Sequence, residues 1–263
     1  YINKQLQIAG IILLKWRKEK MKKIFQISYL SILICLMMFI LSSCGFDKNN
    51  ATISDISYDN NKDEYEVYVK ENGKYVPFLV LQSDYQDGKT LLLRKECLPE
   101  VRRFNDYSSY YEDSEIDQFL SNEYITYLDE ISDKVESVDI TIAAKEALNI
   151  AGNETKLINR KVFLPSLKES CQDCKYNVNE GEKIDYFEEY KNRMCIMNGE
   201  SVTWMLRTPV TSLGSLIYVY TFNDELSMQN AFDSAGVRPA FCIDSSTKIV
   251  YEKYSGGERF VVK

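Results

Sequence analysis

The sequence contains no histidine. Histidine is the usual general base near neutral pH and the commonest metal-binding side chain. Its absence excludes Ser-His and Cys-His nucleophiles, which weighs against an enzyme. Chemistry that uses carboxylates alone stays open, because the chain has 39 Asp and Glu residues. From the sequence we predict no catalytic residue, no metal site and no cofactor.

Basic charge is scarce beyond residue 43. Residues 1–43 hold seven Lys and Arg against one acid, so the full-chain charge of −7 leaves −13 on residues 44–263. A surface so acidic repels phosphate backbones, which excludes nucleic acid as a partner. It also disfavours electrostatic docking to anionic lipid.

The N-terminal part carries a long apolar run. Two lysines precede the mostly apolar residues 24–41, and a short stretch of small residues then ends at Cys44. This order is typical of an export signal. It resembles the signal of bacterial lipoproteins, in which the cysteine after the cleavage site is acylated. The resemblance implies a domain attached to the membrane through a lipid on Cys44, at the extracytoplasmic face. The alternative is an uncleaved anchor, because the run approaches the roughly 20 residues that span a bilayer.

The expected domain boundaries follow from this signal. Residues 1–20 precede Met21 and do not begin with methionine, and we interpret them as an over-extended reading frame. Residues 21–43 are the predicted signal peptide, which is excluded from the fold. Residues 44–62 are a polar lipidated tether, and residues 63–263 are expected to form one globular domain.

The chain has seven cysteines, of which five lie beyond Cys44. An odd number in a domain outside the cytoplasm leaves at least one thiol free or bonded to another molecule. The CxxC spacing of Cys171 and Cys174 suits zinc, redox chemistry or a small disulfide loop, but neither a second CxxC nor a histidine completes a zinc site. We interpret most thiols as structural and leave their pairing open. The five beyond Cys44 are Cys97, Cys171, Cys174, Cys195 and Cys242.

Turn signals and periodicity predict the secondary structure. Asn-Gly and Asp-Gly at residues 72–73 and 87–88 separate three strands of a meander. A helix is expected from Ser114, with the Asp117 carboxylate reaching back to the Ser114 amide, and another over residues 186–193. Strands at both ends with a helix between them predict an α+β fold, with a mixed or antiparallel sheet and a few helices. The expected strands span about residues 65–69, 75–81, 90–93, 135–142, 161–164, 202–206, 215–221, 226–232, 237–243, 248–251 and 259–262.

Three segments together carry a family resemblance. Residues 78–93 form an opening block with an apolar strand, a glycine turn and three leucines. Residues 113–123 resemble a helix of the form S-x-I-R-x-W-L-N. Residues 204–209 and 236–240 resemble a W-L-R-S-P…G-V-R-P-A ending. In this order the segments are similar to an uncharacterised bacterial family, domain-of-unknown-function family 6273.

The same ending is distantly similar to C-type-lectin-like domains, in which a Gly-x-Arg strand near the C-terminus closes a mixed sheet. The similarity implies a C-type-lectin-like architecture. The lectins' calcium-binding triplet, Glu-Pro-Asn or Gln-Pro-Asp, is absent from this sequence. Asn223-Asp224 matches a calcium-ligand segment of lectins only faintly, and the dipeptide is also an ordinary turn.

Five residues are candidates for ligand binding. Tyr107, Tyr110 and Tyr111 form an aromatic cluster in a Ser-containing loop, a composition that suits a recognition surface. Ordinary packing is the alternative, since the chain has 19 tyrosines. Arg207 and Arg238 lie in apolar strand patterns, where they would either form an anion pocket or hold backbone carbonyls and a buried acid. For the two arginines we favour the second role.

These observations predict a membrane-anchored extracytoplasmic lipoprotein whose domain binds a glycan or a protein. The alternative from a different class is a hydrolase of cell-wall or glycan substrates that uses two carboxylates. A third is a structural component of the cell envelope. The export signal and the missing histidine together favour binding.

Overall fold

The computed structural model describes residues 47–48, 50–59, 65–170 and 177–263. The chain divides into two compact units at residue 47, and nearly all described residues belong to the second unit. The predicted signal, Cys44 and the CxxC pair lie outside the described residues, so the expectations about them stay predictions. Among the residues that the structure describes, no helix has the length and hydropathy that crossing a membrane requires.

The fold starts with the predicted three-stranded meander of β1 (Glu66–Glu71), β2 (Lys74–Gln86) and β3 (Lys89–Arg94). Val67 and Val69 alternate with more exposed residues in β1 and point into the core. The turn between β1 and β2 has φ values of 49° and 76° at Asn72 and Gly73. Successive positive φ values define the turn type that Asn-Gly favours, which fixes the antiparallel register of the hairpin. The predicted meander is therefore confirmed.

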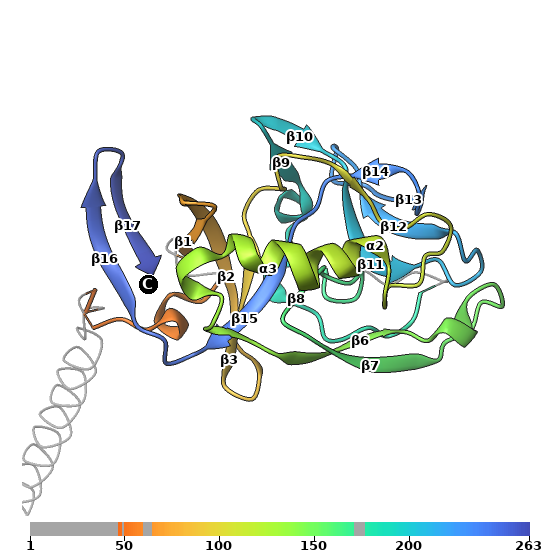
Figure 1. Cartoon of the computed structure of the whole chain (residues 1–263), viewed down its shortest axis with the longest axis horizontal. Helices are drawn as coiled ribbons and strands as arrows, with labels where there is room; N and C mark the ends of the chain where they lie inside the picture. Colours follow the sequence, from red (N-terminus) through yellow and green to blue (C-terminus); the bar gives the residue numbers. More distant parts are fainter. Residues whose placement is uncertain (1–46, 49, 60–64, 171–176) are drawn as a thin grey trace, which may run out of the picture. The chain divides into compact units, whose positions relative to one another are not determined.

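The meander belongs to a curled sheet of eight described strands in the order β16-β17-β1-β2-β3-β15-β5, with β8 also paired to β15 (Figure 1). The pairs are antiparallel except that of β17 with β1, which is parallel and joins the C-terminal strand to the start of the domain. The mixed sheet expected from the sequence is confirmed. The further strands of this sheet are β5 (Val135–Glu136), β8 (Val162–Phe163), β15 (Ala240–Asp244), β16 (Ile249–Tyr254) and β17 (Gly257–Val262).

Smaller sheets form the other part of the unit. One has the order β11-β12-β13, and three two-stranded ladders pair β6 with β7, β9 with β10 and β4 with β14. The two motifs of the family resemblance meet here, because the Met205 amide donates to the Gly236 carbonyl at 3.0 Å. These strands are β4 (Arg102–Arg103), β6 (Val138–Ala143), β7 (Thr155–Arg160), β9 (Cys195–Met197), β10 (Glu200–Val202), β11 (Trp204–Pro209), β12 (Leu216–Tyr220), β13 (Leu226–Asn230) and β14 (Ser234–Ala235).

One helical segment runs through α2 (Glu115–Gln118), the π-helical η2 (Phe119–Tyr124) and α3 (Ile125–Tyr127). Ser114 caps its start, since its hydroxyl accepts from the Asp117 amide at 3.2 Å. The predicted reciprocal bond is wrong in its partner: the Asp117 carboxylate accepts from the Asp113 amide at 3.0 Å instead. The remaining helical turns, all 3-10, are η1 (Ile53–Ile56), η3 (Asp129–Ile131), η4 (Lys145–Ala147), η5 (Asp185–Glu188) and η6 (Tyr190–Arg193).

The α+β expectation is therefore correct for the sheet and wrong for the helices. The structure is mostly β, with one short helical segment. The helix expected over residues 186–193 consists of two 3-10 turns, η5 and η6. Its charged and aromatic residues lack a continuous apolar face, so nothing sustains an α-helix there.

The chain before β1 is packed against the domain. Ile53 and Ile56 of η1 are buried, and the Ile53 amide donates to the Thr247 carbonyl at 2.8 Å. The Ile249 amide in β16 donates to the Ala51 carbonyl at 3.1 Å. The polar composition of residues 51–59 favours a tether. In the structure, their two buried isoleucines hold this stretch on the sheet.

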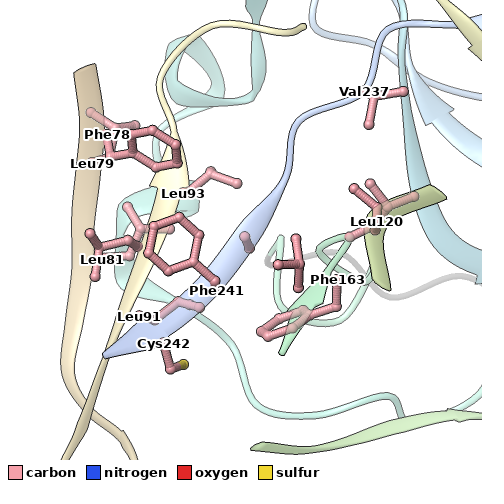
Figure 2. Close-up of a cluster of buried hydrophobic side chains, with 14 of the residues drawn as sticks. Phe78, Leu79, Leu81, Leu91, Leu93, Leu120, Phe163, Val237, Phe241 and Cys242 are labelled. Atoms are coloured by element: carbon pink, nitrogen blue, oxygen red, sulfur yellow. The ribbon is translucent and has the colours of Figure 1, made fainter. Parts of the chain in front are cut away.

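The core lies between the curled sheet and the helical segment. Phe241 of β15 packs on Phe78 of β2 with ring centroids 5.2 Å apart, and Figure 2 shows these rings beside Leu93 and Leu81. From the other side, Leu120 of η2 and Phe163 of β8 point toward the same core. These contacts hold the helical segment in a fixed position relative to the meander. The meander and the helical segment each contribute one wall of the candidate site.

Candidate functional site

Arg207 lies inside the protein and binds protein atoms only. It is fully buried in β11, where its guanidinium grips the Glu169 carboxylate with two bonds of 2.7 and 2.8 Å. It also donates to the backbone carbonyls of Leu164 at 2.6 Å and Thr141 at 3.2 Å. Burial opposes its charge, but the Glu169 carboxylate raises the pKa of Arg207 on balance. Every nitrogen of the guanidinium is in use, so Arg207 has no donor left for a ligand.

A second buried acid adjoins this pair. The Glu180 carboxylate accepts from the Ala143 amide at 2.8 Å and from the Thr208 hydroxyl. Burial raises the pKa of Glu180 to about 7, against the lowering effect of Arg207 and Thr208. Tyr85 contributes a hydroxyl that donates to Glu169 at 2.6 Å. This network joins β2, β6 and β11 inside the domain.

Arg238 is also internal. Its Nε donates to the Arg94 carbonyl at 2.9 Å, and its guanidinium carbon lies 5.3 Å from the centroid of the Trp204 ring. Trp204 is itself fully buried and donates its indole N–H to the Arg193 carbonyl at 2.6 Å. Arg207 and Arg238 thus connect separate backbone segments and do not converge on a pocket for an anion.

The three candidate tyrosines have different environments. Tyr111 is buried against Phe104, and burial raises its pKa well above the usual range. Tyr110 is half-buried and donates to Glu112 at 2.6 Å. Tyr107 is 84% exposed. The structure therefore separates the cluster and leaves Tyr107 as its exposed member.

Exposed apolar side chains occur near the loop that carries Tyr107. The Ser109 amide donates to the Gly214 carbonyl at 2.9 Å, which places this loop beside exposed Leu213. The Asn105 amide donates to the Ala231 carbonyl at 3.0 Å, next to exposed Phe232. The loop edge thus combines aromatic and apolar surface.

The described residues do form a pocket elsewhere, around Arg102. Its volume is about 190 Å³. Three segments build it: the turn after β1, the loop between β3 and β4, and the helical segment. The Asn72 amide donates to the Tyr127 carbonyl at 2.8 Å, which fixes the first segment against the third. The lining residues are Glu71, Asn72, Leu98, Pro99, Glu100, Arg102, Phe119 and Tyr127.

Arg102 is the distinctive residue of this pocket. Its guanidinium carbon lies 3.5 Å from the centroid of the Phe119 ring, in the geometry of a cation–π contact. Its Nη2 lies 3.8 Å from a Glu123 carboxylate oxygen. Its Nε atom is buried and has no hydrogen-bond partner among the described residues. A buried donor without an acceptor is uncommon and costs free energy, so an acceptor from outside the chain would be stabilising here.

The Glu71 carboxylate in the pocket wall is already fully engaged. Arg94 donates to both of its oxygens at 3.0 and 3.1 Å. The Tyr124 hydroxyl donates to one of them at 2.7 Å. Because these donors occupy both oxygens, Glu71 is poorly placed to bind a ligand or act on a substrate. Glu100, by contrast, is exposed and has no hydrogen bond to a donor in the described part of the chain.

No three acidic or cysteine side chains in the described parts of the chain gather as a metal-binding group. The CxxC pair lies outside those parts, so the alternatives that the sequence allows for Cys171 and Cys174 stay open.

A family model described as Domain of unknown function (DUF6273) matches residues 87–245. This match covers more than half of the chain, and the chain belongs to that family. It includes the helical segment, Arg102 and both closing motifs, whereas Glu71 and Asn72 precede it. No curated protein and no solved structure matches the chain. The match therefore identifies the domain but gives no function for it.

Sequence reasoning missed the Arg102 pocket. The available signal was weak: Arg102-Arg103 is a basic pair in a strongly acidic domain. Of the two, Arg103 is an exposed surface residue that pairs with Asp106 and Glu115. The packing of Arg102 on Phe119 distinguishes Arg102 from Arg103, and that contact is not visible in the sequence.

Proposed function

We propose that this protein is a lipid-anchored binding domain on the outer face of the cytoplasmic membrane, and that the Arg102 pocket binds a neutral glycan. The observation that carries the proposal is a pocket lined by Arg102 and two aromatic rings, in which the buried Arg102 Nε has no acceptor among the described residues. Small-ligand sites commonly combine apolar or aromatic walls with a few polar groups.

The charges around the pocket select a neutral ligand over an anion. Arg94 pairs with Glu71 and Arg102 with Glu123, and Glu100 adds a further carboxylate to the lining, so acids outnumber bases. The domain as a whole is also acidic, which repels anions at longer range. A sugar has hydroxyl oxygens that accept from Arg102, hydroxyl donors for Glu100, and a C–H face that packs on Tyr127.

The size of the pocket limits what it holds. Sites for drug-sized molecules usually span about 300–1,000 Å³, and this one has about 190 Å³. It therefore suits a single sugar unit, with the rest of an oligosaccharide outside. The exposed loop edge with Tyr107 is a second surface that such a chain would contact.

A carboxylate-only hydrolase is not favoured by this geometry. Two acids line the pocket, but both oxygens of Glu71 already accept hydrogen bonds from Arg94 and Tyr124. Glycosidases need one acid that is free to give up a proton and one that is free to attack or activate water. Only Glu100 meets that condition.

Calorimetric titration of the full chain in detergent tests the binding proposal. The ligands are neutral oligosaccharides of glucose, galactose, mannose and N-acetylglucosamine. At least one is expected to bind with a Kd between about 10 μM and 1 mM, as suits a small site. Arg102→Ala should weaken that binding at least tenfold, whereas the matched Arg103→Ala should change it less than twofold. Equal effects of the two variants, or turnover of the sugar, would contradict the proposal.

Radiolabelled palmitate tests the anchor in the bacterial cell. The proposal predicts that the wild-type chain and Cys35→Ser take up label and that Cys44→Ser does not. Recovery of an unlabelled wild-type chain from the cytosol would refute the location while leaving the pocket untested by that experiment. The titration above is independent of it.

A further inference from the structure

Two buried cysteines from distant parts of the sequence lie next to each other. Cys97 follows β3, and Cys195 begins β9, 98 positions later. The Cys97 amide donates to the Ile196 carbonyl at 2.9 Å, so the two backbones run side by side. Each thiol lies close enough to the other to affect its pKa. Neither side chain is exposed by more than a few per cent.

The surroundings of Cys97 confirm this placement independently. A Cβ built on Gly236 would lie 2.8 Å from the Cys97 sulfur and 3.3 Å from a Val202 methyl carbon. Val202 is the cross-strand partner of Cys195 in the β9–β10 hairpin. The Cys97 sulfur therefore points at the place where this hairpin passes Gly236. The absence of a side chain at Gly236 leaves room for the sulfur.

The local charges also suit thiol chemistry. Burial opposes ionisation of both thiols and raises the pKa of Cys97 strongly. At Cys195 the neighbouring Cys97 and the guanidiniums of Arg238 and Arg94 outweigh burial and lower the pKa. The thiolate is the reacting form of cysteine. Of the pair, Cys195 is therefore the better nucleophile.

We propose that Cys97 and Cys195 form a disulfide when the chain folds in the presence of a disulfide oxidant. One thiolate attacks the sulfur of the oxidant, RSSR, giving a mixed disulfide and one released RS⁻. The second cysteine then attacks the mixed disulfide and releases the second RS⁻. Both protons pass to the released thiolates or to water, so two protein thiols are oxidised and one RSSR is reduced to two RSH.

The bond would act on the candidate site as well as on stability. Leu98, Pro99 and Glu100 line the Arg102 pocket and directly follow Cys97. Joining Cys97 to β9 would therefore fix the start of that wall. A loop of this length also restricts the unfolded chain strongly when it is closed.

Peptide mapping tests the proposal on the full chain, prepared reduced and then treated with glutathione disulfide. Free thiols are alkylated in denaturant before digestion with trypsin. The expected product joins residues 96–102 to residues 194–207, and the link disappears after reduction. Cys171 and Cys174 share one tryptic peptide, so a bond between them gives a different product. Recovery of Cys97 and Cys195 in alkylated form, or linked to other cysteines, would overturn the proposal.

Thermal unfolding with and without dithiothreitol adds a second readout. Reduction should lower the Tm of the oxidised wild type by roughly 5–10 °C. Cys97→Ser and Cys195→Ser should not respond to the reductant in this way. Cys242→Ser is the matched control, because Cys242 is equally buried in β15 between β3 and β5. It should keep the full response, and a loss of the response in this variant would contradict the assignment.

Discussion

Arg207 and Arg102 are both packed against aromatic rings and acids, but the protein uses them differently. Arg207 has every nitrogen hydrogen-bonded within the domain, to Glu169 and to backbone carbonyls. Arg102 has a cation–π contact, a distant acid and one buried nitrogen that finds no partner among the described residues. The first arginine is part of the interior framework. The second has the free donor that a binding site requires.

The comparison shows that burial alone does not mark a functional arginine. The desolvation cost of Arg207 is offset inside the protein by a bidentate carboxylate. The cost at the Arg102 Nε is not offset within the described residues. We therefore expect changes at Arg207 to affect mainly stability, and changes at Arg102 to affect mainly binding.

The largest effect is expected from Arg207→Met. Removing the guanidinium leaves the Glu169 carboxylate buried without its partner, which typically costs about 3–5 kcal/mol. The free energy of unfolding, measured with urea, should fall by that amount. Arg103→Met is the control, since Arg103 is exposed and solvent screens its ion pairs, so its loss should be much smaller. Similar losses in both variants would remove the distinction between the two arginines.

The pH dependence of stability tests the same interior network through Glu180. Burial raises its pKa in the folded protein to about 7, above the usual carboxyl value near 4.5. Below pH 4.5 the group is protonated in both states. As pH rises from there through 7, the unfolded state releases the proton more easily, so stability falls by about 3 kcal/mol.

Glu180→Gln should remove this fall. Urea unfolding of both proteins between pH 5 and 8 gives the difference curve that isolates Glu180 from the other groups. The wild type should lose stability relative to the variant across this interval. A flat difference curve would mean that Glu180 titrates with an ordinary pKa in the folded protein.

A smaller effect is expected from Tyr124→Phe, because Tyr124 bonds to Glu71 in the wall of the Arg102 pocket. The change removes one hydrogen bond to the charged Glu71 but leaves both bonds from Arg94. Bonds to charged groups contribute about 1.5–3 kcal/mol, and the free energy of unfolding should fall by about 2 kcal/mol. Tyr127→Phe, which loses a bond to the exposed Glu123, should cost much less. The reverse order would show that Glu71 does not depend on Tyr124.

The smallest effect on stability is expected from Arg102→Ala. The variant loses one cation–π contact and one long ion pair, but it also removes the unpartnered Nε. The free energy of unfolding should change by less than about 1 kcal/mol. Thermal and urea unfolding measure this directly. A loss comparable to that of Arg207→Met would place Arg102 in the framework with Arg207.

Local signals in the sequence predicted local structure well. The turns at Asn72-Gly73 and Asp87-Gly88 need positive φ values that these residues adopt readily, and both hairpins are present. The C-terminal hairpin of β16 and β17 also follows from its glycines. Pairings between distant segments were not predictable. The parallel pair of β17 with β1 joins residues nearly 200 positions apart, and no local pattern encodes it.

The candidate site shows the same limit. The environments of Tyr107 and Tyr111 differ although the residues are four positions apart, because Tyr111 meets Phe104 in the core and Tyr107 does not. The Arg102 pocket needs three segments to converge, and each looks ordinary by itself. Sequence reasoning identified the internal role that Arg207 was expected to have, since an arginine in an apolar strand must find partners.

The most direct test of the account is the nuclear magnetic resonance signal of the Arg102 Nε–H group, assigned by its loss in Arg102→Lys. Addition of a neutral oligosaccharide that binds the protein should shift this signal in a saturable way with the same Kd as calorimetry. The Arg103 Nε–H signal should stay in place. A ligand that binds while the Arg102 signal does not move would contradict the claim that this nitrogen receives the ligand.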